Sequence, residues 1–264
     1  MLLNAMTLVL RETLEAILLL AVLLVSARIM GLALAWVLAG IGLGLCGATF
    51  YGVNLTRISE SFDYMGQEVL NGFMLLAGVG SLTLLAGLLG ADCHARHKAV
   101  TVLLIVLSAT LAVTQEAAEI LVYLSGILSH GELVQPVLTG SVLGAGIAVS
   151  VGIIVYYGLL SLGAANMRNV VFILLAVIAG SMLSQALLLM TQADWLPYSP
   201  VAWDSSRWLS EQTIIGQLFY ALAGYEATPS VFQVIGYVGA ASIVLMAAWV
   251  GHIVTRQPTG PSHP

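Results

Sequence analysis

Residues 99–124 read AVTVLLIVLSATLAVTQEAAEILVYL, an apolar run broken near its end by Gln115-Glu116-Ala117-Ala118-Glu119. About 20 helical residues cross the hydrocarbon core of a bilayer, so the run predicts a membrane-spanning helix. Its two glutamates stand at positions i and i+3 and therefore share one helical face. A charged residue near a helix centre costs roughly 2.5–3.5 kcal/mol in lipid, so this face is expected to turn into a helical bundle.

The rest of the chain has the same character. Of 264 residues, 59% are hydrophobic and only 8% are charged, whereas soluble domains need about 25% charged residues. Without the alternation of barrel strands, the apolar runs predict helices. The net charge of −5, with no basic stripe, excludes nucleic acid as a partner, and two distant cysteines imply no disulfide framework. Seven runs are long enough to span: 5–27, 31–53, 68–91, 99–124, 136–161, 169–191 and 231–254.

Lysine and arginine positions predict the orientation of these helices. The connections after the first, third, fifth and seventh spans hold Arg28, Arg96, Lys98, Arg168 and Arg256; the others hold Arg57 and Arg207. Cytoplasmic loops carry the excess of basic residues, so the N-terminus is expected outside and the C-terminus inside. The predicted domains are a six-helix transport core (1–191), an external interfacial segment (192–230) with an interfacial helix at 203–222, a seventh membrane helix (231–256) and a disordered tail (257–264).

A second motif, Arg11-Glu12-Thr13-Leu14-Glu15, lies in the first span. Glu116 follows Glu12, and Glu119 follows Glu15, by the same 104 positions, and this offset also carries Gly40-x-Gly42 onto Gly144-x-Gly146. The common offset predicts duplication of a three-helix unit, with repeats at 1–91 and 99–191. Since three spans is an odd number, the second copy must be inverted, an arrangement typical of secondary transporters.

Four inward carboxylates predict a cation site. Hard oxygen ligands suit iron, manganese, magnesium or calcium. Arg11 can compensate one glutamate and Gln115 compensates none, which leaves up to three uncompensated negative charges. The predicted metal ligands are Glu12, Glu15, Glu116 and Glu119, with Arg11 and Gln115 as supporting residues. The alternative is purely structural: an ion pair with Arg11 in the first motif and protonated glutamates in the second.

These motifs, in the first and fourth of seven helices, resemble the oxidase-dependent high-affinity iron permease family, which includes fungal iron permeases and bacterial permeases of the EfeU type. The stretch before the last span is also similar to that family, at Trp203-Asp204-Ser205, Leu209-Ser210, Gly216 and GYEATPS (224–230). Two departures concern charge: Gln115 stands where the family usually has arginine, and Asn71 stands where a second acid is common.

The resemblance implies that the four glutamates are metal ligands along a permeation path and that iron, as Fe2+ or Fe3+, is the transported substrate. It implies no enzymatic activity and no cofactor. It further implies a multi-pass protein of the plasma membrane (the bacterial inner membrane), surrounded by lipid. A periplasmic oxidase, cytochrome or iron-binding protein would deliver the metal.

Two polar groups are secondary candidates. An external acidic vestibule is predicted from Glu60, Asp63 and Glu68, with a solvated loop as the alternative. A cytoplasmic metal exit is predicted from Asp92, Cys93, His94 and His97, with a short polar loop as the stronger interpretation.

Other functions remain open or are excluded. An importer of another divalent metal, such as manganese or lead, and a proton-coupled solute carrier would use the same buried glutamates. A haem-linked electron carrier would need histidines inside spans, and all five lie at span ends or in loops. A Schiff-base receptor would need a buried lysine, but Lys98, the only lysine, precedes a span.

Overall fold

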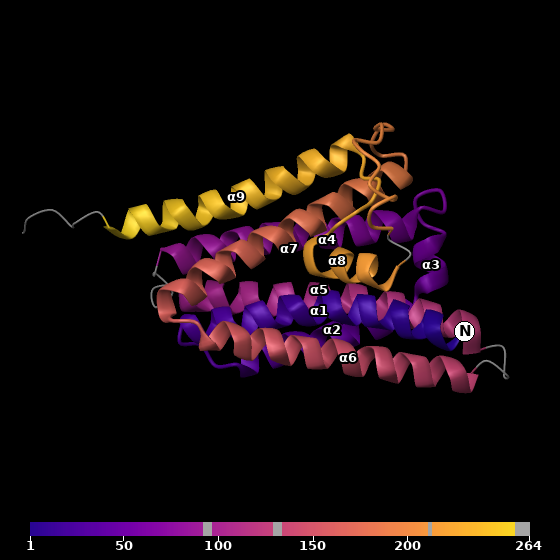
Figure 1. The fold of residues 1–264 in the computed structure, drawn as a ribbon, viewed down its shortest axis with the longest axis horizontal. Helices are drawn as coiled ribbons and strands as arrows, with labels where there is room; N and C mark the ends of the chain where they lie inside the picture. Colours follow the sequence, from indigo (N-terminus) through magenta and orange to yellow (C-terminus); the bar gives the residue numbers. More distant parts are fainter. Residues whose placement is uncertain (92–96, 129–133, 211–212, 257–264) are drawn as a thin grey trace, which may run out of the picture.

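The computed structural model describes residues 1–91, 97–128, 134–210 and 213–256 (Figure 1). Over these residues the chain forms seven long helices, side by side, and two short ones. The long helices are α1 (Leu2–Ile29), α2 (Ala35–Val53), α4 (Gly66–Gly90), α5 (Lys98–Leu128), α6 (Val134–Ser161), α7 (Ala164–Gln192) and α9 (Val231–Arg256). The short ones are α3 (Leu55–Ser59) and α8 (Ile214–Ala223). Each predicted span coincides with one long helix, so the all-α class is confirmed.

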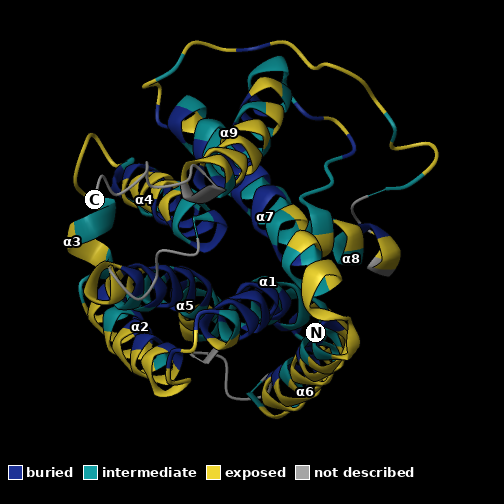
Figure 2. Cartoon of the chain, turned by 90° about the vertical axis from the view of Figure 1, so that its left-hand side faces the viewer, coloured by how far each residue is buried: buried dark blue, intermediate teal, exposed yellow. Residues whose placement is uncertain are grey.

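Six of the long helices, all except α1, are long and apolar enough to cross a membrane. Helix α1 is also long, with 28 residues, but it carries Arg11, Glu12, Glu15 and Arg28. The exposed faces of α2, α6 and α9 support a lipid surrounding: Figure 2 shows their outer sides exposed, and large apolar side chains cover them, including Leu38, Leu45, Val142, Ile154, Ile235 and Trp249. Helices α1 and α5 lie further inside the bundle (Figure 2).

Glycines bring two pairs of helices into close contact. Helix α6 packs along α1, where a Cβ on Gly140 or Gly144 would lie only 2.4 Å from the carbonyl oxygen of Leu2 or Met6. A side chain would push these backbones apart, so the glycines permit the packing.

Helix α2 packs along α5 in the same way. A Cβ on Gly40 would lie 2.9 Å from the Val106 carbonyl oxygen, and one on Gly44 would lie 3.0 Å from that of Thr110. Thr110 Oγ1 also donates a hydrogen bond to the Gly40 carbonyl oxygen, at 3.3 Å.

These contacts change one detail of the predicted repeat. The 104-residue offset relates Leu2 to Val106 and Met6 to Thr110. Gly140 contacts Leu2, whereas Gly40 contacts Val106. In the same way, Gly144 contacts Met6, whereas Gly44 contacts Thr110. The glycines therefore correspond at an offset of 100 residues. Gly42 and Gly146, which the 104-residue offset relates, both have nothing within 4 Å of an added Cβ.

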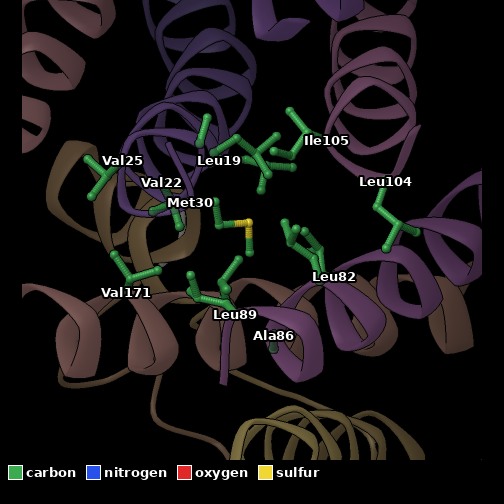
Figure 3. Packing of buried hydrophobic residues seen from close by; sticks show 14 of the residues in the cluster. Leu19, Val22, Val25, Met30, Leu82, Ala86, Leu89, Leu104, Ile105 and Val171 are labelled. Carbon is green, nitrogen blue, oxygen red and sulfur yellow. The ribbon is translucent and has the colours of Figure 1, made fainter. Parts of the chain in front are cut away.

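The main hydrophobic core fills the half of the bundle away from the N-terminus. Figure 3 shows Leu19 and Val22 of α1, with Met30 directly after the end of α1, facing Leu82 and Leu89 of α4. Leu104 and Ile105 of α5 and Val171 of α7 complete the same cluster. The cluster is contiguous and buried, so packed apolar side chains fill this half of the bundle.

The segment between α7 and α9 differs from the single interfacial helix predicted at 203–222. Among its described residues, the helical ones are Ile214–Ala223; the helix starts where Thr213 Oγ1 accepts a hydrogen bond from the Gly216 amide and ends at Gly224, whose φ is +63°. Residues before it are held in a loop, because the Ser205 amide donates to the Ala227 carbonyl oxygen at 2.8 Å. Ser206 donates to Asp204 through its amide and hydroxyl, which keeps the pKa of the exposed Asp204 carboxyl below its usual value.

Helix α8 does not lie over the end of the bundle as an interfacial helix would. It packs against α1 and α7 at the side of the bundle, where Figure 2 shows it at the edge of the molecule; Ile215 and Phe219 are exposed, and the Tyr220 ring lies against Arg11 of α1. The short helix therefore contributes side chains to the interior.

Candidate metal site

The two glutamate pairs lie at matching depths on helices that run in opposite directions. Helix α2 returns from α1 after a short turn, and α5 follows α2 in the same direction, so α1 and α5 are antiparallel. At 1.5 Å per residue, Glu12 lies about 15 Å from the start of α1 and Glu119 about 14 Å from the end of α5. Glu15 and Glu116 lie deeper, at about 20 and 18 Å.

The carboxylates thus form two levels. We call Glu12 and Glu119 the outer level, because they are nearer the end of the bundle that holds the N-terminus, and Glu15 and Glu116 the inner level. Glu12 and Glu116 are buried, with 3% and 9% of their surfaces exposed, and both line the same cavity. The antiparallel arrangement of α1 and α5 therefore brings the two sequence motifs together.

Three cavities follow one another through these levels. An outer cavity of about 330 Å³ is lined by both outer-level glutamates, with Arg11, Tyr51, Gln67, Glu68 and Asn71 among the other residues. A central cavity of about 150 Å³ is lined by all four glutamates, together with Arg11, Gln115, Gln185 and Tyr220. An inner cavity of about 50 Å³ is lined by both inner-level glutamates and by Gln115, Ser181 and Gln185, and is otherwise mostly apolar. Neighbouring cavities share lining residues, so the three are in series.

Arg11 is the single cationic residue that lines the central cavity. Its Nη2 lies 2.6 Å from Glu12 Oε1, and its Nε lies 3.9 Å from Glu15 Oε1. The guanidinium also stacks over the Tyr220 ring of α8, 5.0 Å from the ring centroid, a cation–π distance. Gln115, at the corresponding place in the second motif, is 5% exposed and lines the central and inner cavities. The charge of the lining is therefore strongly negative, and its one compensating cation lies closest to Glu12 of the outer level and farther from Glu15 of the inner level.

Two oxygens among the described residues are buried and accept no hydrogen bond. Glu15 accepts one bond at Oε2, from Gln185 Nε2 at 3.3 Å, but its Oε1 has no hydrogen-bond partner. Asn71 Oδ1, in the outer cavity, has none either. Buried polar atoms nearly always have partners, so both oxygens are suited to a bound cation or water.

The four glutamates do not converge on one point. Across the described part of the chain, no three histidine, cysteine, aspartate or glutamate side chains come close enough to hold a metal ion together. The glutamates line a common cavity from opposite sides, so a cation there would contact the outer or the inner level, with other oxygens completing its coordination.

The structure places the residues of the two secondary candidate sites, the vestibule and the cytoplasmic exit, in different surroundings. Glu68, in the first turn of α4, lines the outer cavity. Glu60 and Asp63 are exposed and line none of the three cavities. Of the predicted exit residues, His97 is exposed just before α5, while Asp92, Cys93 and His94 lie outside the described residues.

Two lining residues were missed from the sequence: Gln185 and Tyr220. Gln185 lies inside the predicted span 169–191, and a polar side chain within a span is a signal that could have identified it. Tyr220 could not have been found in this way, because its place depends on α8 packing against α1.

A bundle of apolar helices enclosing carboxylate-lined cavities is the architecture of a multi-pass membrane transporter. The model of the iron permease FTR1 family matches residues 94–258. The chain therefore belongs to this family of iron permeases, which are transporters and not enzymes. The match contains Glu116, Glu119, Gln185 and Tyr220, and the first glutamate motif lies before it. No curated protein and no solved structure matches the chain.

Proposed function

We propose that this chain imports iron across the plasma membrane through a path formed by the two Glu-x-x-Glu motifs, with Glu12, Glu15, Glu116 and Glu119 as metal ligands. One observation carries the proposal: all four carboxylates, from helices far apart in sequence, line the same buried cavity. Desolvating four carboxylates is costly unless a cation or protons balance them, so this cavity is suited to bind a metal. Family membership makes iron the substrate of choice.

The proposal includes α1 as a seventh membrane helix, with the N-terminus outside and the C-terminus inside. Helix α1 is as long as its neighbours and packs along α6, and its charged residues Arg11, Glu12 and Glu15 all line the central cavity. Charges that face a polar cavity do not meet lipid, so they do not prevent α1 from spanning. The basic residues of the connections, which favour the same orientation, support the cytoplasmic placement of the C-terminus.

An inverted repeat explains why the two motifs meet. We take α1, α2 and α4 as one copy and α5, α6 and α7 as the other. The exchange of partners between copies, α1 with α6 and α2 with α5, supports this division, as do the paired glycine contacts. Inversion places the first glutamate of one motif level with the second glutamate of the other, which produces the outer and inner levels.

Iron would approach from the outer cavity, where Glu68 adds negative charge, and then reach the outer-level and inner-level glutamates. Beyond the inner cavity, the apolar cluster around Leu19, Leu82 and Ile105 closes the path. Passage to the cytoplasm therefore requires these helices to separate, as alternating access between two repeats would provide. A periplasmic oxidase, cytochrome or iron-binding protein would deliver the metal to the outer cavity.

The test is radio-iron uptake by cells that express the chain, with manganese, zinc and lead as competitors. We expect iron uptake that is abolished by a chelator and reduced at least tenfold by Glu119→Gln. Stronger transport of manganese or lead than of iron would assign the path to that metal. Uptake that a chelator does not reduce would instead support a proton-coupled solute carrier and overturn the proposal.

A further inference from the structure

Four residues line both the central and the inner cavity: Glu15, Gln115, Glu116 and Gln185. They come from α1, α5 and α7 and consist of two carboxylates and two carboxamides. No other residue is common to both linings. The junction of the two cavities is therefore surrounded by oxygen-bearing side chains of two kinds, charged and neutral.

The burial and hydrogen bonding of these residues suit a small cation. Gln115 and Glu116 are 5% and 9% exposed. Glu15 Oε1 is buried and accepts no hydrogen bond. Gln185 donates to the other oxygen of Glu15 through Nε2, at 3.3 Å, and so leaves its own amide oxygen available for coordination.

Charge distinguishes this junction from the outer level. Arg11, the cationic residue of the central cavity, lies 2.6 Å from Glu12 Oε1 and 3.9 Å from Glu15 Oε1, and it does not line the inner cavity. The two inner-level carboxylates supply two negative charges when ionised, and the amides add oxygens without adding charge. Carboxylate and amide oxygens are the ligands of hard divalent cations.

We propose that Gln115 and Gln185 are metal ligands of the transport path. They complete an inner-level site of two carboxylate and two amide oxygens, whose two negative charges balance a divalent cation, Fe2+. This inference rests on the proposed function and specifies its substrate. A cationic side chain in place of Gln115, as at Arg11 in the first motif, would remove one ligand oxygen and oppose the bound charge.

The test measures anaerobic Fe2+ binding by titration calorimetry, using the full chain in lipid nanodiscs. Gln115→Met and Gln185→Met keep side-chain length and remove the amide, and each is expected to weaken the Fe2+ Kd at least tenfold. Gln185→Glu keeps the oxygen and adds a charge, so it is expected to bind Fe2+ as tightly as the wild type or more tightly, and to bind Ga3+ more tightly than the wild type. Gln135→Met, on an exposed site of α6, is the matched control and should bind as the wild type does.

Each variant is first compared with the wild type by gel filtration and unfolding temperature. If a methionine variant is destabilised, Gln→Asn at the same position, which retracts the amide by one methylene group, is expected to show the weakened binding in a folded protein. Wild-type Fe2+ binding by both methionine variants would overturn the inference. So would equal loss in Gln185→Met and Gln185→Glu, because that result would limit Gln185 to donating a hydrogen bond to Glu15.

Glu15→Gln and Glu116→Gln distinguish this inference from the proposed function. If these two variants lose Fe2+ binding while the methionine variants keep it, only the ligand role of the glutamines fails. If all four variants bind as the wild type does, the glutamate path fails as well.

Discussion

Arg11 Nη2 lies 2.6 Å from Glu12 Oε1, whereas the second motif has Gln115 at the position that corresponds to Arg11. The two halves of the central cavity are therefore unequal in charge. The outer level has one of its carboxylates paired with a guanidinium, and the inner level has amides beside its carboxylates. We expect this difference to order the binding of a cation, with the more negative inner level holding it more tightly.

Arg11→Gln removes the cation that lines the central cavity. Arg11 Nε lies 3.9 Å from Glu15 Oε1, so a cation on Glu15 would lie within roughly 6 Å of the guanidinium, where one unit charge in partly hydrated surroundings changes the binding free energy by about 1 kcal/mol. We therefore expect an approximately fivefold tighter Fe2+ Kd in nanodiscs, together with a lower maximal uptake rate, because release becomes slower. Arg57→Gln, on the exposed short helix α3, should change neither quantity. Weaker binding in Arg11→Gln would show that Arg11 holds the glutamates in place more than it opposes the metal.

Glu68 is the vestibule acid that the structure brings to the outer cavity. Its negative charge should concentrate cations at the mouth of the path without contacting them at the inner level. Glu68→Gln is expected to raise the KM for iron uptake two- to fivefold and leave the maximal rate unchanged, with a smaller effect at high ionic strength. Glu60→Gln, on an exposed turn, is the control. An equal effect of the two substitutions would assign the attraction to the whole acidic surface.

Alanine substitutions at Gly144 and Gly146 test the packing of α6 on α1. A Cβ on Gly144 would lie 2.4 Å from the Met6 carbonyl oxygen, and one on Gly146 would meet nothing within 4 Å. Gly144→Ala should therefore lower the free energy of unfolding by about 1–3 kcal/mol, as overpacking does, while Gly146→Ala should not reduce it. The measurement is the unfolding temperature of each variant in detergent. Equal temperatures for the two variants would mean that the helices can separate at no cost.

Much of the fold is predictable from the sequence because long apolar runs in a bilayer have few structural options. The apolar run at 231–254 coincides with α9, Val231–Arg256, and the run at 31–53 coincides with α2, Ala35–Val53. Backbone groups in lipid must bond within their own helix, so length and hydropathy suffice to predict these elements. The segment at 203–222 is different, because its loop depends on contacts between Ser205 and Ala227 that no local pattern signals.

The candidate site was predictable in part. Glutamates at i and i+3 in apolar runs signal an inward face, and the structure places all four in one cavity. The contributions of Gln185 and Tyr220 arise from tertiary packing: Gln185 meets Glu15 across 170 positions of sequence, and Tyr220 reaches Arg11 only because α8 packs against α1. The glycine contacts relate Gly40 to Gly140 and Gly44 to Gly144, an offset of 100 residues instead of the 104 between the glutamate motifs, and only the packing of the helices reveals this difference.

The most direct test of the glutamate path is the initial rate of anaerobic Fe2+ uptake into proteoliposomes, using the purified wild type and Glu→Gln variants at positions 12, 15, 116 and 119. Glutamine keeps the size of each side chain and removes its charge, so folding can be matched between samples by gel filtration. We predict that every one of the four variants is at least tenfold slower than the wild type, while Glu60→Gln transports at the wild-type rate. Wild-type rates in all four variants would contradict the account.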